Sequence, residues 1–215
     1  MLRRLGFIVL LLGLGSAQAE VMEVNVWKTL PGKAAEAQSA FKEARAIHQR
    51  HGAGVSIIND FEFNTRYVMF FEDWEAWNKS ATGFLQDKEW QALLARGQKS
   101  PVLEHHANHL INVIERSETL GSVVETYIWE PLPGGNQRLF DAGLRSKKLH
   151  EKAGVSVLVG ADRLDRMIYS ISFPDWGAYA KFMDTPNAEY QAFMAKEMAD
   201  PAGKLVEVIT GSVVD

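Results

Sequence analysis

FEDWEAW at residues 71–77 returns as FPDWGAY at residues 173–179, so that Trp74 and Trp176 stand 102 positions apart (176 minus 74). Further pairs follow in the same order, at intervals of 102 or 100 residues: Trp27 and Trp129, Leu30-Pro31-Gly32 and Leu132-Pro133-Gly134, Gly54-Val55-Ser56 and Gly154-Val155-Ser156, Tyr67 and Tyr169, and Glu89-Trp90-Gln91-Ala92 and Glu189-Tyr190-Gln191-Ala192. Repeated motifs in a fixed order indicate an internal duplication. The fold is therefore predicted to consist of two similar units.

Hydrophobic patterns predict the secondary structure of the first unit. Residues 22–28 alternate between apolar and polar side chains, as in a half-buried strand. Residues 33–51 carry apolar side chains three or four apart, as in an amphipathic helix. Residues 55–63 and 67–71 alternate again, which predicts a hairpin with its turn at Asn64-Thr65.

The rest of the unit completes a recognisable order of elements. A helical region is predicted from residue 73 to about 99, with a break near Thr82-Gly83, followed by a strand from Pro101 to about residue 115. The second unit repeats this succession over residues 123–214. The order is the ferredoxin-like βαββαβ arrangement of an α+β fold. Because helices cover only one face of such a sheet, the two sheets are predicted to pack on each other.

The first residues of the chain are predicted to be a signal peptide rather than part of the fold. Arg3 and Arg4 precede an apolar run over residues 5–14, which ends at the small-residue site Ala17-Gln18-Ala19. A retained membrane anchor would need about 20 apolar residues. We therefore expect cleavage before Glu20, a first repeat over 20–118, a second over 119–215, and a periplasmic protein that stays off the membrane once cleaved.

Composition narrows the classes of partner. The sequence holds no cysteine, so the secreted chain must be stabilised by its core rather than by disulfides. Its net charge is −4, and removal of Arg3 and Arg4 leaves 21 basic against 27 acidic residues, about −6. Nucleic acid binding needs clustered positive charge, so this class of partner is not expected.

Each unit resembles the dimeric α+β barrel superfamily, especially its antibiotic-biosynthesis-monooxygenase-like and NIPSNAP-like members. The resemblance rests on the order of elements, on the motifs at residues 71–77 and 173–179, and on TPNAEYQAF at residues 185–193. It implies an intramolecular pseudo-dimer in place of the usual two subunits, with a further homo-oligomer left open. The superfamily includes cofactor-free oxygenases, haem-degrading enzymes, isomerases, lyases and proteins without known activity, so the fold does not decide the function.

The resemblance singles out residues of the first repeat as candidate catalytic groups. In the haem-degrading branch, an asparagine on the first strand and a tryptophan in the second helix lie beside an axial histidine. Asn25 and Trp77 match the first two positions, whereas Leu94 and, in the second repeat, Met194 stand where the histidine would be. We therefore expect no haem and no other cofactor. The alternative for Asn25 is a polar residue on an exposed strand face.

Histidines and aromatic residues extend this candidate site. His48 is included as a catalytic candidate because cofactor-free oxygenases of the superfamily stabilise a substrate anion with Asn, Trp, Tyr or His donors. The candidate ligand-binding residues are Trp27, Tyr67, Trp74, Trp90 and His109. Such aromatic residues more often belong to a core, but a pocket between sheet and helices would suit a small apolar or aromatic molecule, such as a quinone.

The second repeat is predicted to be the scaffold half. It has Tyr127 at the position of Asn25, and only His150 corresponds to a first-repeat histidine. The sequence thus favours a cofactor-independent monooxygenase acting on an aromatic or quinone-like compound. Non-catalytic ligand binding or a structural role remains as the alternative.

The histidine tract His105-His106-Ala107-Asn108-His109 suggests metal binding, a lesser alternative together with haem. On a strand, His105 and His109 would point the same way but lie about 13 Å apart, at a rise of roughly 3.3 Å per residue. That distance is too long for one tetrahedral ion. We therefore expect no metal site in the tract itself.

Overall fold

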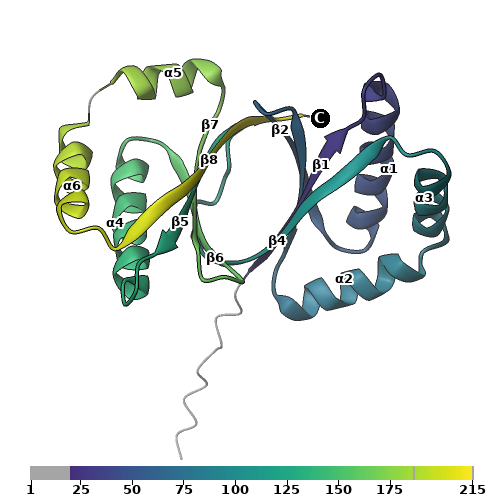
Figure 1. The fold of residues 1–215 in the computed structure, drawn as a ribbon, viewed down its shortest axis with the longest axis horizontal. Helices are drawn as coiled ribbons and strands as arrows, with labels where there is room; N and C mark the ends of the chain where they lie inside the picture. The colour runs from purple at the N-terminus through teal and green to yellow at the C-terminus, as the bar shows by residue number, and fades with distance from the viewer. Residues whose placement is uncertain (1–19, 186, 215) are drawn as a thin grey trace, which may run out of the picture.

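The computed structural model describes residues 20–185 and 187–214, which form one closed eight-stranded barrel with helices on two opposite sides (Figure 1). The predicted signal peptide, residues 1–19, lies outside the described residues. Among the helices that are described, none combines the length and apolar character needed to span a membrane.

The two repeats have the same order of elements, and the predicted α+β fold is confirmed. The first repeat consists of β1 (Val21–Thr29), α1 (Ala34–Arg50), β2 (Gly54–Asp60), β3 (Asn64–Phe71), α2 (Trp74–Gln86), α3 (Lys88–Lys99) and β4 (Leu103–Arg116). The second consists of β5 (Val123–Pro131), α4 (Asn136–Lys152), β6 (Ser156–Asp162), β7 (Met167–Phe173), α5 (Trp176–Asp184), α6 (Ala188–Ala199) and β8 (Gly203–Val213).

The two sheets meet face to face across the barrel and are also hydrogen bonded edge to edge. The strand order around the barrel is β1-β3-β2-β8-β5-β7-β6-β4, so that each repeat contributes four adjacent strands. The repeats join at two antiparallel seams, β2 with β8 and β4 with β6. Closure removes the exposed strand edges that an isolated ferredoxin-like sheet would leave.

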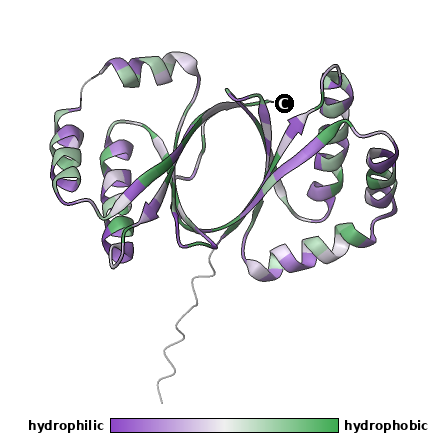
Figure 2. Cartoon of the chain, viewed as in Figure 1, coloured by the Kyte–Doolittle hydropathy of each residue, from purple (hydrophilic) through white to green (hydrophobic). Residues whose placement is uncertain are grey.

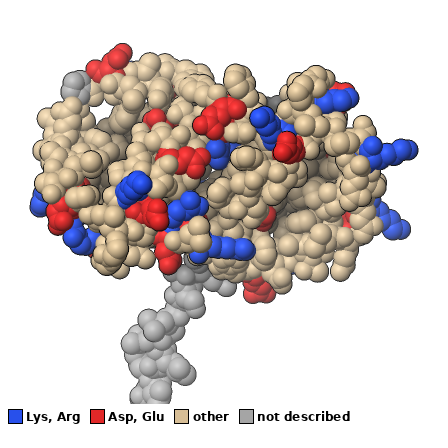
Figure 3. Space-filling view, viewed as in Figure 1, with Lys and Arg blue, Asp and Glu red and all other residues tan. Residues whose placement is uncertain are grey.

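Successive side chains of each strand point to opposite faces of its sheet, and in this barrel both faces carry apolar residues. The inner face forms one buried cluster: Met22, Val68, Ile111, Val113, Ile128, Leu158 and Ile168. The outer faces form two further clusters, one for each repeat, beneath the helices. Hydrophobic and hydrophilic residues alternate along the helices in Figure 2, as expected when one side of each helix packs on the sheet. On the face that Figure 3 shows, basic and acidic side chains are interspersed.

Glycine and isoleucine are paired at both seams. A Cβ atom at Gly211 would lie 2.6 Å from the backbone oxygen of Asn59 and 2.9 Å from Cγ2 of Ile58. At the other seam, a Cβ atom at Gly160 would lie 2.6 Å from Cγ2 of Ile111. Both isoleucines belong to the first repeat and both glycines to the second. The two repeats are therefore complementary at the seams rather than interchangeable.

This complementarity predicts the behaviour of an isolated half. Residues 20–118 expressed alone should be insoluble or partly folded, because they expose the inner sheet face and two strand edges. A homodimer would place isoleucine where the native seams have glycine. Co-expression with residues 119–215 should restore a soluble one-to-one complex, which size-exclusion chromatography can detect. A well-folded monomer of the first half would contradict this prediction.

The predicted break in the second helical region is misplaced. The helix α2 continues through Thr82-Gly83, and the break lies at Asp87, whose carboxylate accepts hydrogen bonds from the backbone N–H groups of Glu89 and Trp90 and so caps α3. Gly83 has another role, because a Cβ atom there would lie 2.6 Å from Nδ1 of His51.

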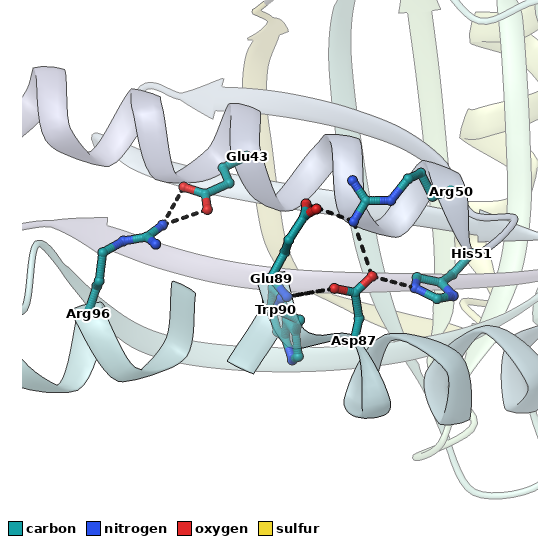
Figure 4. Close-up of polar contacts among 7 residues, drawn as sticks. All are labelled: Glu43, Arg50, His51, Asp87, Glu89, Trp90 and Arg96. Carbon is teal, nitrogen blue, oxygen red and sulfur yellow. Dashed lines mark hydrogen bonds and ion pairs between the residues drawn. The ribbon is translucent and has the colours of Figure 1, made fainter. Parts of the chain in front are cut away.

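Asp87 also joins α3 to α1 (Figure 4). Its Oδ2 lies 2.9 Å from Nε2 of His51 and 3.1 Å from Nη2 of Arg50. The hydrogen bond from His51 is the main reason that the pKa of Asp87 is lowered. A second link, between Arg96 of α3 and Glu43 of α1, lies further along the same pair of helices.

The turn of the first hairpin is also displaced from its predicted position. Residues 61–63 form the turn, and Asn64 begins β3. The cause is Asp60, whose Oδ1 accepts hydrogen bonds from the backbone N–H groups of Glu62 and Asn64, at 3.0 and 2.8 Å. Its Oδ2 accepts a 2.9 Å hydrogen bond from Nε of Arg66. Asp162 organises the second hairpin in the same way.

The fourth strand confirms that the histidine tract is extended, but a β-bulge changes its faces. The register of β1 against β4 shifts between Val26 and Trp27. His105 contacts Trp27 on the helix-covered face, with ring centroids 4.7 Å apart, whereas His109 lines the barrel interior. The prediction that both point the same way is therefore wrong, because the bulge adds one residue between them.

Candidate functional site

A pocket of about 550 Å³ lies between the sheet and the helices of the second repeat. It is lined mainly by aromatic and aliphatic side chains, among them Tyr127, Trp129, His150, Tyr169, Phe182, Tyr190, Phe193 and Met194. A volume of this size and an apolar lining with a few polar groups are typical of small-molecule sites.

The sequence explains why this pocket is open. Gly143 lines the pocket at the position where the first repeat has Phe41 (143 minus 41 is 102), and Phe41 stacks on Tyr67 at 6.0 Å. Tyr190 stands where the first repeat has the larger Trp90. The helix over the pocket is also shorter, with 9 residues in α5 against 13 in α2.

A histidine–tyrosine pair forms the buried polar part of the pocket. Nδ1 of His150 lies 2.6 Å from the hydroxyl of Tyr169. Burial lowers the pKa of His150 to about 4 and raises that of Tyr169. Both side chains are therefore uncharged at neutral pH. Because Nδ1 is engaged by Tyr169, a ligand can form a hydrogen bond only with Nε2. The ring centroid of Tyr190 lies 4.4 Å from that of the imidazole.

A buried carboxylate on the first strand of the repeat lies near Tyr127. Glu125 is 6% exposed, and its Oε2 has no hydrogen-bond partner within the described residues. Burial raises the pKa of Tyr127, and the neighbouring charge of Glu125 raises it further. Tyr127 thus stays protonated, with its hydroxyl engaged by Glu125.

The first repeat holds the matching histidine–tyrosine pair in a layer filled by larger rings. Nδ1 of His48 lies 2.8 Å from the hydroxyl of Tyr67. Burial lowers the pKa of His48 to about 4. Phe84 and Trp90 each lie 4.7 Å from the imidazole. In this described layer, Nε2 of His48 and Nε1 of Trp90 are buried without a hydrogen-bond partner.

Glu23 brings two of the predicted catalytic residues together. Its Oε2 accepts a 2.8 Å hydrogen bond from Nε1 of Trp77, and its Oε1 accepts bonds from Nδ2 of Asn25 at 3.2 Å and of Asn108 at 2.9 Å. Sequence reasoning missed Glu23 and its counterpart Glu125. The duplication could have identified both residues, because Glu23 and Glu125 occupy equivalent positions 102 residues apart (125 minus 23).

The other predicted ligand-binding residues fall into separate places. Trp74 lies 5.6 Å from Trp77 and donates a 2.9 Å hydrogen bond to Oδ1 of Asn112. Trp27 packs beside His105 at the bulge. His109 lies on the other side of the sheet from all of these. The described residues contain no group of three metal-ligating side chains.

No protein-family model and no curated protein sequence matches this chain. Several solved structures share its fold at low sequence identity. A candidate monooxygenase of Fusobacterium nucleatum superimposes with a TM-score of 0.67 at 12% identity, covering 92% of this chain and 94% of that one. A candidate monooxygenase of Lactobacillus acidophilus gives 0.64 at 12% identity, covering 92% and 100%.

A haem-binding protein of Thermus thermophilus gives a TM-score of 0.56 at 11% identity, covering 92% of each chain. These likenesses show the fold alone, which in this chain is a closed barrel made of two ferredoxin-like halves.

Proposed function

We propose that this protein binds a small, largely apolar aromatic or quinone-like molecule and oxidises it with O2 as a cofactor-independent monooxygenase. The observation that carries the proposal is the uncharged His150–Tyr169 pair at the wall of the 550 Å³ pocket. The fold likeness to two candidate monooxygenases supports the same class. Non-catalytic binding of such a molecule is the second candidate, and it uses the same pocket.

The lining explains the expected ligand. Trp129, Tyr190 and Phe193 supply flat surfaces against which an aromatic ring can stack. The hydroxyl of Tyr190 is a donor for a carbonyl or phenolate oxygen of the ligand, and the developing charge on that oxygen strengthens the hydrogen bond.

The proposed reaction draws all its electrons from the substrate. Nε2 of His150 accepts a proton from an acidic C–H or O–H group of the substrate, and Nδ1–H donates to Tyr169. The resulting substrate anion reduces O2. In a CH2-to-C=O oxidation, one oxygen atom enters the product and the other leaves as water with the two hydrogens of the CH2 group, which balances the reaction.

The residues of the pocket do not suit haem. Met194 lines the pocket at the position that the superfamily resemblance assigns to an axial histidine. The one histidine in the lining, His150, is held by Tyr169. The proposed reaction therefore contains no haem-dependent step. A Soret absorption band in the purified protein would contradict this part of the proposal.

The sequence-based prediction of a first-repeat site, with Asn25, Trp77 and His48 as catalytic residues, can be tested against the second-repeat pocket by matched variants. A thermal-shift screen of phenols, anthrones and quinones should identify ligands, since a ligand at 100 times its Kd stabilises by about 2.7 kcal/mol. We expect His150→Gln to lower turnover by about 10²- to 10⁴-fold. His48→Gln should leave turnover within a few-fold.

Each other outcome selects a different interpretation. Loss of turnover only in His48→Gln, Asn25→Ala or Trp77→Ala would place the site in the first repeat. Binding without turnover in the wild type would favour the non-catalytic candidate. The absence of any ligand in the screen, with both variants indistinguishable from the wild type, would point to a structural role.

We also propose that the protein acts in the periplasm. The support is the signal-peptide pattern of residues 1–19. Fractionation of the native host should recover the protein in the periplasm with Glu20 as its first residue. Recovery of the uncleaved chain in the membrane would overturn this assignment.

A further inference from the structure

A second cavity, of about 390 Å³, lies inside the barrel, on the opposite face of the sheet from the proposed catalytic pocket. Strands of both repeats line it mainly with apolar residues, among them Met22, Val68, Ile111, Ile128, Leu158 and Ile168. Its volume falls within the range of small-molecule sites.

The second repeat supplies the space for this cavity. Ser170 and Ser172 line it at the positions where the first repeat has Val68 and Phe70, each 102 residues earlier. The serine hydroxyls are already bonded within the protein. Ser170 pairs with Oγ1 of Thr126 at 2.8 Å, and Ser172 accepts a 3.0 Å bond from the backbone N–H of Gly121. The wall around them therefore remains effectively apolar.

One end of the cavity is polar, and the two polar side chains that line this end belong to the first repeat. Arg66 and His109 line this end, whereas the corresponding residues of the second repeat are Ile168 and Ile209. A symmetric dimer would carry the same side chains on both sides of its axis. The fused chain instead has an apolar cavity with a single polar end.

The charges at the polar end are already paired. Arg66 lies 2.9 Å from Oδ2 of Asp60 and 3.7 Å from Oε1 of Glu207, and Arg166 lies 2.6 Å from Oδ2 of Asp162. Three carboxylates thus accompany two guanidinium groups. A ligand carboxylate would add a fourth anion in a partly desolvated place, which is unfavourable. An uncharged polar group meets no such cost.

His109 is the group that such a ligand can bond. Burial lowers the pKa of this half-buried imidazole, and the charges of Arg166 and Arg66 lower it further against the opposing influence of Glu207 and Asp162. Neutral imidazole provides one donor and one acceptor. It therefore matches a hydroxyl or a carbonyl oxygen equally well.

The opposite end of the cavity is bounded by the connection between the repeats. Leu120 lines the cavity and is 41% exposed, so it forms part of an opening to solvent. Gly121 and Ser122 continue this rim, and a side chain at Gly121 would overlap the backbone of Phe173. An elongated molecule can thus enter beside Leu120 and reach His109 with its far end.

We propose that the barrel interior is a second ligand site, separate from the catalytic pocket, for an uncharged elongated apolar molecule that carries one terminal hydroxyl or carbonyl group. The apolar chain occupies the space beside Ser170 and Ser172, and the terminal oxygen is hydrogen bonded to His109.

Titration of the full mature protein with 1-decanol, decanoate and decane tests the site. We expect 1-decanol to bind at least about tenfold more tightly than decanoate at neutral pH, because of the paired charges. His109→Leu should weaken 1-decanol binding on the order of 5-fold and leave decane unchanged. The assignment of the polar end would be overturned if the wild type bound 1-decanol and decanoate equally well. It would also be overturned if the wild type and His109→Leu bound 1-decanol with the same affinity.

Filling the cavity tests its location. Ser170→Val and Ser172→Phe introduce the side chains that the first repeat has at these positions, and together they should abolish binding. His150→Gln is the matched control, since it disables the proposed catalytic pocket and should not change 1-decanol binding. Nuclear Overhauser effects between decanol methylenes and the methyl groups of Ile168 and Ile209 in the wild type provide a readout that does not depend on any variant folding. Their absence at saturation would overturn the proposal, whatever the fate of the proposed oxidation.

Discussion

Acidification from about pH 6.5 to 4 will lower the free energy of unfolding by several kcal/mol, with His48 and His150 responsible for most of the slope. Both histidines are buried, and burial lowers the pKa of each from 6.5 to about 4. The unfolded chain takes up both protons as the pH falls below about 6.5, whereas the folded chain does so only near pH 4. Stability is therefore full above pH 6.5 and declines by up to about 1.4 kcal/mol per pH unit for each histidine.

Denaturant titrations between pH 7.5 and 4 measure this slope. In the double variant His48→Gln, His150→Gln, the slope should fall to the part contributed by carboxylates such as Asp87, whose lowered pKa acts at more acidic pH. The variant will be less stable at neutral pH because the two bonds to Tyr67 and Tyr169 change, so the slope and not the absolute value is decisive. A slope equal to that of the wild type would contradict the prediction.

Gly211→Val will open the seam between β2 and β8. The new Cβ atom would meet the backbone oxygen of Asn59 at 2.6 Å, and backbone cannot turn aside as a flexible side chain can. Overpacking of this kind costs about 1–3 kcal/mol or more. Gly97→Ala is a suitable control, because nothing lies within 4 Å of a Cβ atom at this position in α3. It should raise stability by up to about 1 kcal/mol through helix propensity.

Amide hydrogen exchange locates the damage within the molecule. In Gly211→Val, the N–H groups of Phe61 and Val214, which donate across this seam to Thr210 and Ile57, should exchange faster. The N–H group of Ser117, which donates to Val157 near the other seam, should be affected less. Wild-type stability and wild-type exchange in this variant would show that the seam tolerates a side chain.

The architecture could be predicted from the sequence. The duplication indicates that the order of elements is repeated, and the alternation of apolar and polar residues indicates which face of each strand is buried. The sequence was insufficient wherever one local group overrides a periodic pattern. The break between the helices lies at Asp87, whose carboxylate caps α3, and not at Gly83. The carboxylate of Asp60 fixes the hairpin turn before Asn64. The bulge opposite Trp27 places His105 and His109 on different faces, which alternation alone cannot predict.

The location of the pocket depends on differences in side-chain volume between equivalent positions of the two repeats. It does not depend on which repeat has more histidine and aromatic residues. The first repeat has more aromatic and histidine residues, and the sequence therefore favoured it as the site. In the folded chain, Phe41 and Trp90 take up room that Gly143 and Tyr190 leave free in the second repeat. Comparing residue sizes at equivalent positions of the two repeats would have predicted the open layer.

The isoleucine–glycine pairing at the seams has an evolutionary consequence. In a dimer of two identical subunits, every mutation would occur twice, once on each side of the two-fold axis. With Ile58 and Ile111 in one half and Gly160 and Gly211 in the other, a half that paired with a second copy of itself would place isoleucine against isoleucine or glycine against glycine at each seam. Reverting to a single-unit gene would then require simultaneous changes at both seams. In the fused chain each half can change independently of the other, and Arg66 and His109, at positions where the second repeat has Ile168 and Ile209, are an example of such a difference.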